Sequence, residues 1–185
     1  MRRLHFGIWI MFVAALLVDP VASAHQKGWP GKRLSQVYPE AAKFTSRQGG
    51  LSAEQIGRIE QALGERVEAE SRAPTFYPAF DKAGEKIGFV LFADQAGENG
   101  PIEIGVAVDP QGRVRHVVIL SSREDKKIGQ PSFLDQFSGK TAKDPLKIGA
   151  DITPVPGSEK GSQSVANGVR KALLIKQEVF GEQIP

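Results

Sequence analysis

The sequence lacks cysteine altogether, and residues 25–185 contain only two histidines, His25 and His116. The absence of cysteine excludes disulfide scaffolds, thiolate zinc sites, iron–sulfur clusters, thiol-anchored haem and a cysteine nucleophile. Only His116 lies inside a predicted strand, so a Ser-His-Asp triad or a histidine-based metal site would depend on that single residue. We therefore expect no catalytic residues and no metal ligands, and any redox role needs a cofactor held by other groups.

The charge is nearly balanced, with 24 Lys+Arg against 21 Asp+Glu, and no basic run is interleaved with aromatic residues. This pattern argues against nucleic-acid binding. The length of 185 residues and a hydrophobic content of 41% fit one globular domain.

The first 24 residues have the pattern of a secretory signal peptide. Arg2 and Arg3 precede an uninterrupted apolar run at residues 6–18, and Ala22-Ser23-Ala24 forms a cleavage site. The run is shorter than the roughly 20 residues that span a bilayer. We expect a cleaved signal over residues 1–24 and a periplasmic protein, with an uncleaved membrane anchor as the alternative.

Residues 25–75 are interpreted as an N-terminal arm that packs on the domain, with one short helix around residues 34–43. A second helix begins at Ser52, because Ser52 and Gln55 form a capping box and Ile56, Ile59 and Leu63 follow at helical spacing before Gly64.

The middle of the chain predicts an antiparallel meander of at least three strands. Residues 87–93 are largely apolar, residues 102–108 alternate, and residues 114–120 return after the turn at 109–112. His116 is expected to share a strand face with Val114, Val118 and Leu120 in a structural role. Gly105 and Ala107 indicate close approach by a helix or a ligand, or a bulge at Gly105.

Two further helices and two loops complete the predicted order. Residues 121–130 form a charged loop in which Glu124 or Lys126 could line a pocket. A short helix opens at Pro131-Ser132, residues 141–161 are irregular, and Ser164 caps a last helix with Arg170, Lys171 and Lys176 on its polar face. The fold class is α+β: an antiparallel sheet packed against short helices.

The segment before the last helix combines glycines, hydroxyls and a lysine. Such a loop at a helix N-terminus suits a phosphate, because free amides and the helix dipole favour an anion. A helix cap alone also accounts for Ser162 or Ser164. The candidate cofactor-binding residues are Ser158, Lys160, Gly161, Ser162, Gln163, Ser164 and, from the loop that could meet them, Glu124.

The order of these elements resembles the periplasmic FMN-binding domain of the nitrous-oxide regulator NosR and of the flavin subunits of the Rnf and sodium-pumping NADH:quinone oxidoreductase complexes. The resemblance runs from about residue 76 to residue 174. Its closest segments are GPIEIGVAVDPQGRV at 100–114 and FLDQFSGK at 133–140. It implies an FMN-binding-like domain over residues 76–176, followed by a C-terminal tail at 177–185.

In that family a threonine before the last helix carries FMN through a phosphoester bond. The matching position here is Gly161 or, in another register, Glu159, and Ser162 is the nearest hydroxyl. The family's Glu-Thr pair corresponds to Glu124 and Asp125. The resemblance therefore implies FMN held without a covalent bond, its phosphate at residues 158–164 and its ring system against apolar and small side chains of the sheet.

Two functions follow from the resemblance and remain open at this point. In the first, the protein is a periplasmic electron carrier, more than an enzyme with its own substrate, that exchanges electrons with a periplasmic or membrane redox partner. In the second, the fold has lost the flavin and serves as an accessory module that docks such a complex, with peripheral membrane contact. A small hydrolase is disfavoured because it lacks a positioned general base.

Overall fold

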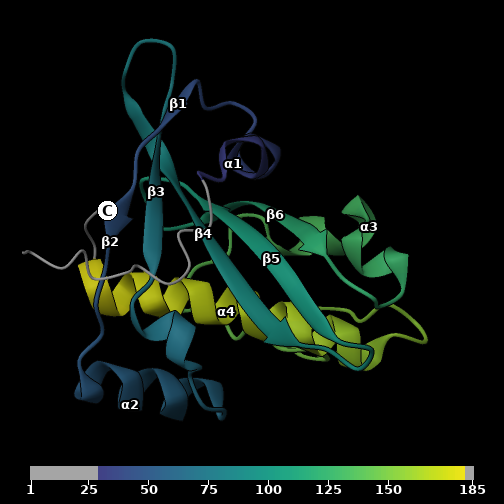
Figure 1. The fold of residues 1–185 in the computed structure, drawn as a ribbon. Coiled ribbons are helices and arrows are strands. Elements are labelled where there is room, and N and C mark those ends of the chain that lie inside the picture. Colours follow the sequence, from purple (N-terminus) through teal and green to yellow (C-terminus); the bar gives the residue numbers. More distant parts are fainter. Residues whose placement is uncertain (1–28, 182–185) are drawn as a thin grey trace, which may run out of the picture.

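A computed structural model describes residues 29–181, so the predicted signal at 1–24 and the end of the predicted tail lie outside the described residues. Figure 1 shows a twisted sheet with one long helix across one face and a short helix on the other. The elements in chain order are α1 (Gly31–Val37), β1 (Lys43–Phe44), β2 (Arg47–Gln48), α2 (Ala53–Leu63), η1 (Ala69–Arg72), β3 (Thr75–Phe80), β4 (Lys86–Ala96), β5 (Pro101–Val108), β6 (Val114–Ser121), η2 (Lys126–Gly129), α3 (Pro131–Leu134), η3 (Asp135–Phe137) and α4 (Glu159–Phe180).

The sheet is antiparallel throughout, in the order β1-β3-β4-β5-β6, with β2 also paired to β3. The α+β class predicted from the sequence is confirmed. The predicted meander corresponds to β4, β5 and β6. Strand β3 is an addition that the sequence analysis did not identify, because Pro78 interrupts its short apolar run and proline is unusual inside strands.

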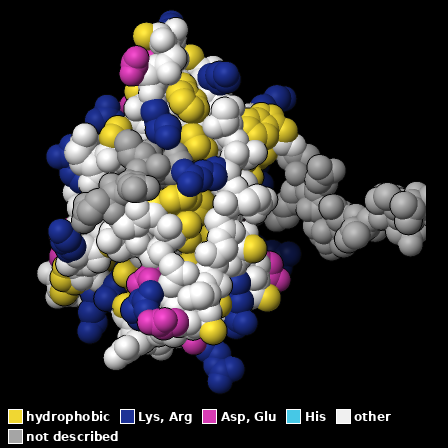
Figure 2. Space-filling model, turned by 90° about the vertical axis from the view of Figure 1, so that its left-hand side faces the viewer, with side chains coloured by type: hydrophobic (Ala, Val, Ile, Leu, Met, Phe, Trp, Pro, Cys, Tyr) yellow, Lys and Arg dark blue, Asp and Glu magenta, His cyan; other side chains and the backbone are white. Residues whose placement is uncertain are grey.

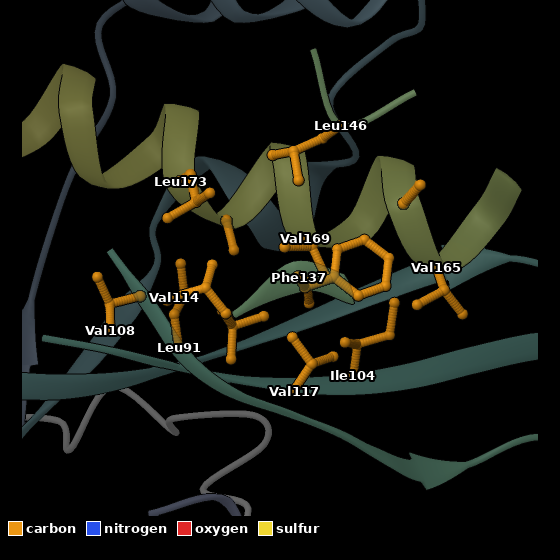
Figure 3. Packing of buried hydrophobic residues seen from close by; sticks show 14 of the residues in the cluster. Leu91, Ile104, Val108, Val114, Val117, Phe137, Leu146, Val165, Val169 and Leu173 are labelled. Atoms are coloured by element: carbon orange, nitrogen blue, oxygen red, sulfur yellow. The ribbon is translucent and has the colours of Figure 1, made fainter. Parts of the chain in front are cut away.

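The main core lies between the sheet and α4. Leu91, Ile104 and Val117 point from the strands toward Val165 and Val169 of the helix, as Figure 3 shows. Gly168 lets the helix approach closely, because a β-carbon there would overlap the side chain of Ile104. Helix α2, α3 and the irregular segment 141–158 complete this layer.

Helix α2 confirms the predicted capping box. The Ser52 hydroxyl accepts a hydrogen bond from the Gln55 amide at 3.2 Å, and the Gln55 side chain accepts one from the Ser52 amide at 2.9 Å. Gly64 ends the helix with a left-handed φ of 76°. The Gln55 side-chain amide also donates to the carbonyl of Glu178, which joins α2 to the end of α4.

Helix α1 occupies the opposite face of the sheet, earlier and shorter than the predicted 34–43. It ends at Tyr38 because Pro39 follows, and a residue before proline is disfavoured in the helical region. Leu34 and Val37 pack on Val90 and Ala107 in a second, smaller core. The predicted packing of the arm on the domain is thereby observed.

A bulge in β6 changes the predicted strand face of His116. Ala107 pairs with His116, but Val108 pairs with Val114, so Arg115 is the extra residue. Val114 therefore joins the core under α4, while Val118 and Leu120 pack on the α1 side, toward which His116 also lies. The expectation that all four share one face was wrong for Val114, because the bulge shifts the alternation by one residue.

The polar face predicted for the last helix was also wrong. Lys171 and Lys176 are buried, because α4 lies between the sheet and the segment that contains α2 and η1. The helix runs to Phe180, beyond the predicted start of a tail at residue 177.

At the end of α4, the Arg47 guanidinium lies 4.5 Å from the centre of the Phe180 ring. Figure 2 shows this side of the molecule as an apolar strip flanked by Lys and Arg.

Candidate functional site

The loop after β6 and the first turn of α4 meet, as the sequence analysis expected. Glu124 is the residue that joins them, and it is only 9% exposed. Its carboxylate accepts hydrogen bonds from the backbone amide of Asn99 at 2.6 Å and from the Asn99 side chain at 3.1 Å. A β-carbon on Gly161 would lie 3.2 Å from a Glu124 oxygen, so the glycine makes room for this carboxylate.

The segment 157–164 is largely helical, so the expectation that Ser164 caps the last helix was wrong. Helix α4 begins at Glu159, with Ser158 as its N-cap. Glu, Lys and Gln are good helix formers, and one glycine costs a helix only about 1 kcal/mol. Here the space left by Gly161 is filled by Ser158 and Glu124.

Three of the predicted side chains bind groups of the protein itself. The Ser162 hydroxyl is buried, donates to the Ser158 carbonyl at 2.8 Å and accepts from the Val155 amide at 2.9 Å. The Ser164 hydroxyl donates to the Ala96 carbonyl at 2.7 Å. Gln163 donates to Asn167 at 2.8 Å. The Ser162 and Ser164 bonds fasten α4 to residues 155 and 96, whereas the Gln163 bond lies within α4.

Lys160 is also paired within the protein, but its side chain is 76% exposed. It binds Glu98 at 2.9 Å, and this hydrogen bond raises the pKa of Lys160. Ser158 is buried and makes no capping hydrogen bond with its side chain. Its hydroxyl lies 2.8 Å from the place of a β-carbon on Gly161. Gly161 is one of the two positions, with Glu159, that the sequence resemblance matched to the flavin-bearing threonine.

A hollow of about 410 Å³ opens beside this helix start, between α3 and the chain that leads into α4. Both polar and apolar groups line the hollow. One of them is the buried ring of Phe133, which contacts the Phe137 ring edge to face. The lining residues are Lys127, Gln130, Ser132, Phe133, Gln136, Thr153, Pro154, Val155 and Pro156. None of them was among the predicted site residues.

Gln136 holds the two walls of the hollow together. Its side-chain oxygen accepts from the Thr153 amide at 2.8 Å, and its nitrogen donates to the Thr153 carbonyl at 3.2 Å. Gln136 and Phe133 both lie in the segment FLDQFSGK on which the resemblance rests. The segment 133–140 was therefore the part of the sequence that could have indicated one wall of the hollow. Residues 153–156, which form another wall, have no distinctive sequence pattern.

The small-residue face of β5 is filled by the protein. A β-carbon on Gly105 would overlap the Val37 side chain, so helix α1 uses the close approach that the sequence predicted. The small side chains at Gly105 and Ala107 are thus not available to a ring system, contrary to the expectation for the sheet. On this side, the Nε2 of His116 donates a 3.0 Å hydrogen bond to the carboxylate of Glu40.

One curated relative covers part of this architecture. The chain is 33% identical over 105 residues to a subunit of the proton-translocating ferredoxin:NAD(+) oxidoreductase complex of Clostridium ljungdahlii. The predicted resemblance is confirmed. The match covers 51% of this chain and 56% of the clostridial protein, so the chain spans little more than half the length of that relative.

Two further comparisons complete this result. Among solved structures, NqrC of Shewanella oneidensis matches with a TM-score of 0.46 and 16% identity, over 76% of this chain and 72% of that chain. No family model matches the sequence. Within residues 29–181, no helix has the length and apolar character to cross a membrane, and no group of three or more acidic, histidine or cysteine side chains is arranged to hold a metal ion.

Proposed function

We propose that this chain is an exported, periplasmic FMN-binding protein that exchanges electrons with a membrane redox complex and holds its flavin without a covalent bond. The observation that carries the proposal is the 33% identity with a subunit of a ferredoxin:NAD(+) oxidoreductase complex. The position of the 410 Å³ hollow beside the start of α4 supports it.

The residues of the hollow suit a non-covalent flavin. Lys127 offers a cation for a phosphate, Ser132 and Thr153 offer hydroxyls, and Phe133 offers an apolar surface for a ring. Bound FMN would supply the capacity to accept and release electrons, and the protein would supply orientation and charge. The predicted phosphate contacts at Lys160, Ser162, Gln163 and Ser164 are weaker candidates, since these groups bind the protein.

The attachment position does not suit a covalent flavin. Gly161 has no side chain, and Glu159 in the alternative register has a carboxylate that accepts a hydrogen bond from the Gly157 amide at 3.0 Å. A phosphoester bond to either residue is chemically excluded, because neither has a hydroxyl. We therefore propose non-covalent FMN.

The test is a visible spectrum of the protein purified from the cells that export it, before and after acid precipitation. Yellow colour that stays in the supernatant supports non-covalent FMN, and colour in the pellet would overturn this part of the proposal. Lys127→Glu should weaken FMN binding about tenfold or more by replacing attraction to the phosphate with repulsion. Lys147→Glu, also an exposed lysine but outside the hollow, should leave the affinity unchanged.

A flavin-free accessory module is the second candidate, favoured by the glycine at the attachment position and by the hydroxyls already bonded within the protein. In that case the purified protein is colourless, does not quench FMN fluorescence in a titration, and still copurifies with a membrane redox complex. Stoichiometric flavin in the preparation would rule this candidate out.

A further inference from the structure

A row of aromatic rings lies on the α1 side of the sheet and ends at the surface. Trp29 contacts Tyr77 edge to face with 5.8 Å between ring centres, and Tyr77 contacts Phe92 at 5.5 Å. The Arg33 guanidinium lies 5.0 Å from the centre of the Phe92 ring. Trp29 is 58% exposed and is the one large hydrophobic side chain within residues 29–181 that is exposed.

The exposed indole has a supported position. The ring lies over Gly31, where a β-carbon would come 3.1 Å from the indole nitrogen, and against Tyr77 on its edge. An exposed tryptophan fixed on a framework of aromatic rings presents apolar surface to the surroundings at little cost in side-chain entropy. It is thus prepared to contact an apolar or interfacial partner.

Two basic residues follow Trp29 closely on α1. Arg33 forms an ion pair with Glu103 of β5. Lys32 is exposed. The first acidic residue after Trp29 in the chain, Glu40, pairs with His116 and Arg115. Tryptophan beside lysine and arginine is the composition of segments that lie at the headgroup level of anionic membranes.

In the alternative in which the apolar run at 6–18 is kept as a membrane anchor, the linking residues 19–28 place Trp29 at most about 35 Å from that run when they are extended. We propose that the face formed by Trp29 and Lys32 rests on the anionic headgroups of a lipid bilayer. This contact is independent of flavin binding, because the hollow lies beside α3 and α4 and shares no residue with this face.

Tryptophan fluorescence of the full chain tests the proposal. The sequence has two tryptophans, so Trp29 is the only one in a Trp9→Phe background. The protein is reconstituted with vesicles of neutral lipid or of neutral lipid mixed with phosphatidylserine, each with and without bromine on the lipid chains near the headgroups. In anionic vesicles we expect a blue shift and a loss of about half of the Trp29 emission to bromine, with clearly less in neutral vesicles.

Two variants separate surface contact from simple tethering. Lys32→Glu should reduce the quenching in anionic vesicles to the neutral-vesicle level, because it replaces attraction by repulsion. Lys147→Glu, an exposed lysine on the loop that packs on the α4 side, should not change it. Equal quenching in neutral and anionic vesicles would show that the protein is only tethered to the bilayer, and it would overturn the proposal. A blue shift without bromine quenching would overturn it in favour of contact with a second protein copy.

Discussion

Lys171 is a charged residue in the middle of the folded chain. Its side chain is fully buried, and its ammonium group donates to Glu68 at 2.8 Å and to the carbonyl of Asp94 at 2.7 Å. Burial by itself would raise the pKa of Glu68, but hydrogen bonds, first of all that from Lys171, lower it overall. The lysine thus links α4 to the segment before η1 and to the C-terminal end of β4.

Replacing Lys171 by methionine should lower the free energy of unfolding by about 2 kcal/mol, because the Asp94 carbonyl loses its charged donor and Glu68 loses its partner. The expected loss is smaller than for a fully buried ion pair, since the Glu68 side chain is 46% exposed. Urea denaturation measures the change. Lys147→Met on the surface should stay within about 0.5 kcal/mol of the wild type. Equal effects of the two variants would contradict a specific role for Lys171.

Asp144 gives a prediction for acid stability. The backbone amide of Thr141 and then its hydroxyl, each at 2.8 Å, hold the pKa of Asp144 below its ordinary value of 3.8. A carboxyl group with a depressed pKa in the folded state stabilises the fold above its unfolded pKa, and the contribution is lost as the pH falls through the folded pKa. Asp144→Asn should therefore flatten the loss of stability below about pH 4. Unchanged pH dependence in thermal unfolding would contradict this.

At the scale of elements, the contact between α1 and β5 depends on one glycine. Val37 fills the space above Gly105, so the helix lies directly on the strand. A second feature is the early start of α4, which places Gly161 against Glu124 and Ser158. Both contacts depend on the absence of a β-carbon. The contacts of Gly105 with Val37 and of Gly161 with Glu124 join segments that are distant in sequence.

Gly105→Ala should destabilise the protein by about 1–3 kcal/mol, because the added methyl group overlaps Val37 and forces α1 away from the sheet. Trp29 fluorescence should change at the same time, since Trp29 lies just before this helix. Gly57→Ala is the matched control. Gly57 is exposed inside α2 with no neighbour for a β-carbon, so alanine should add about 0.5–1 kcal/mol. A neutral Gly105→Ala would show that the α1 contact is loose.

At the scale of the molecule, the arm and the FMN-binding-like segment share one sheet. Strands β1 and β2 both pair with β3, and α1 covers Val90 and Ala107. The predicted boundary at residue 76 therefore lies inside a continuous structure. The boundary marks a change in the sequence pattern, but the residues on its two sides belong to the same sheet.

Deletion of residues 29–50 should abolish cooperative folding, because it removes α1, β1 and β2 and exposes the apolar face of β4 and β5 to water. The expected result is aggregation, or a broad thermal transition without the sharp midpoint of the full chain. A soluble fragment with an unchanged cooperative transition would contradict the shared core. Circular dichroism during heating, together with size-exclusion chromatography, distinguishes these outcomes.

Local chemistry made several elements predictable from the sequence. The Ser52 capping box, the left-handed Gly64 and the turn at Asp109, whose carboxylate accepts from the Gln111 and Arg113 amides, depend on residues close together in the chain. The same holds for the apolar alternation of β4 to β6. The resemblance on segments 100–114 and 133–140 also came from the sequence, and a relative at 33% identity supports it.

Tertiary structure decided what depends on distant neighbours. The burial of Lys171 depends on its partners Glu68 and Asp94. The hydroxyls of Ser162 and Ser164 bind Val155 and Ala96, which lie outside α4. The sequence by itself determined the fold class and most of the elements, and it indicated that the loop at 121–130 could meet the segment 157–164. The bulge in β6 and the hollow beside Phe133 follow from packing between segments, where burial and partner geometry outweigh local propensity.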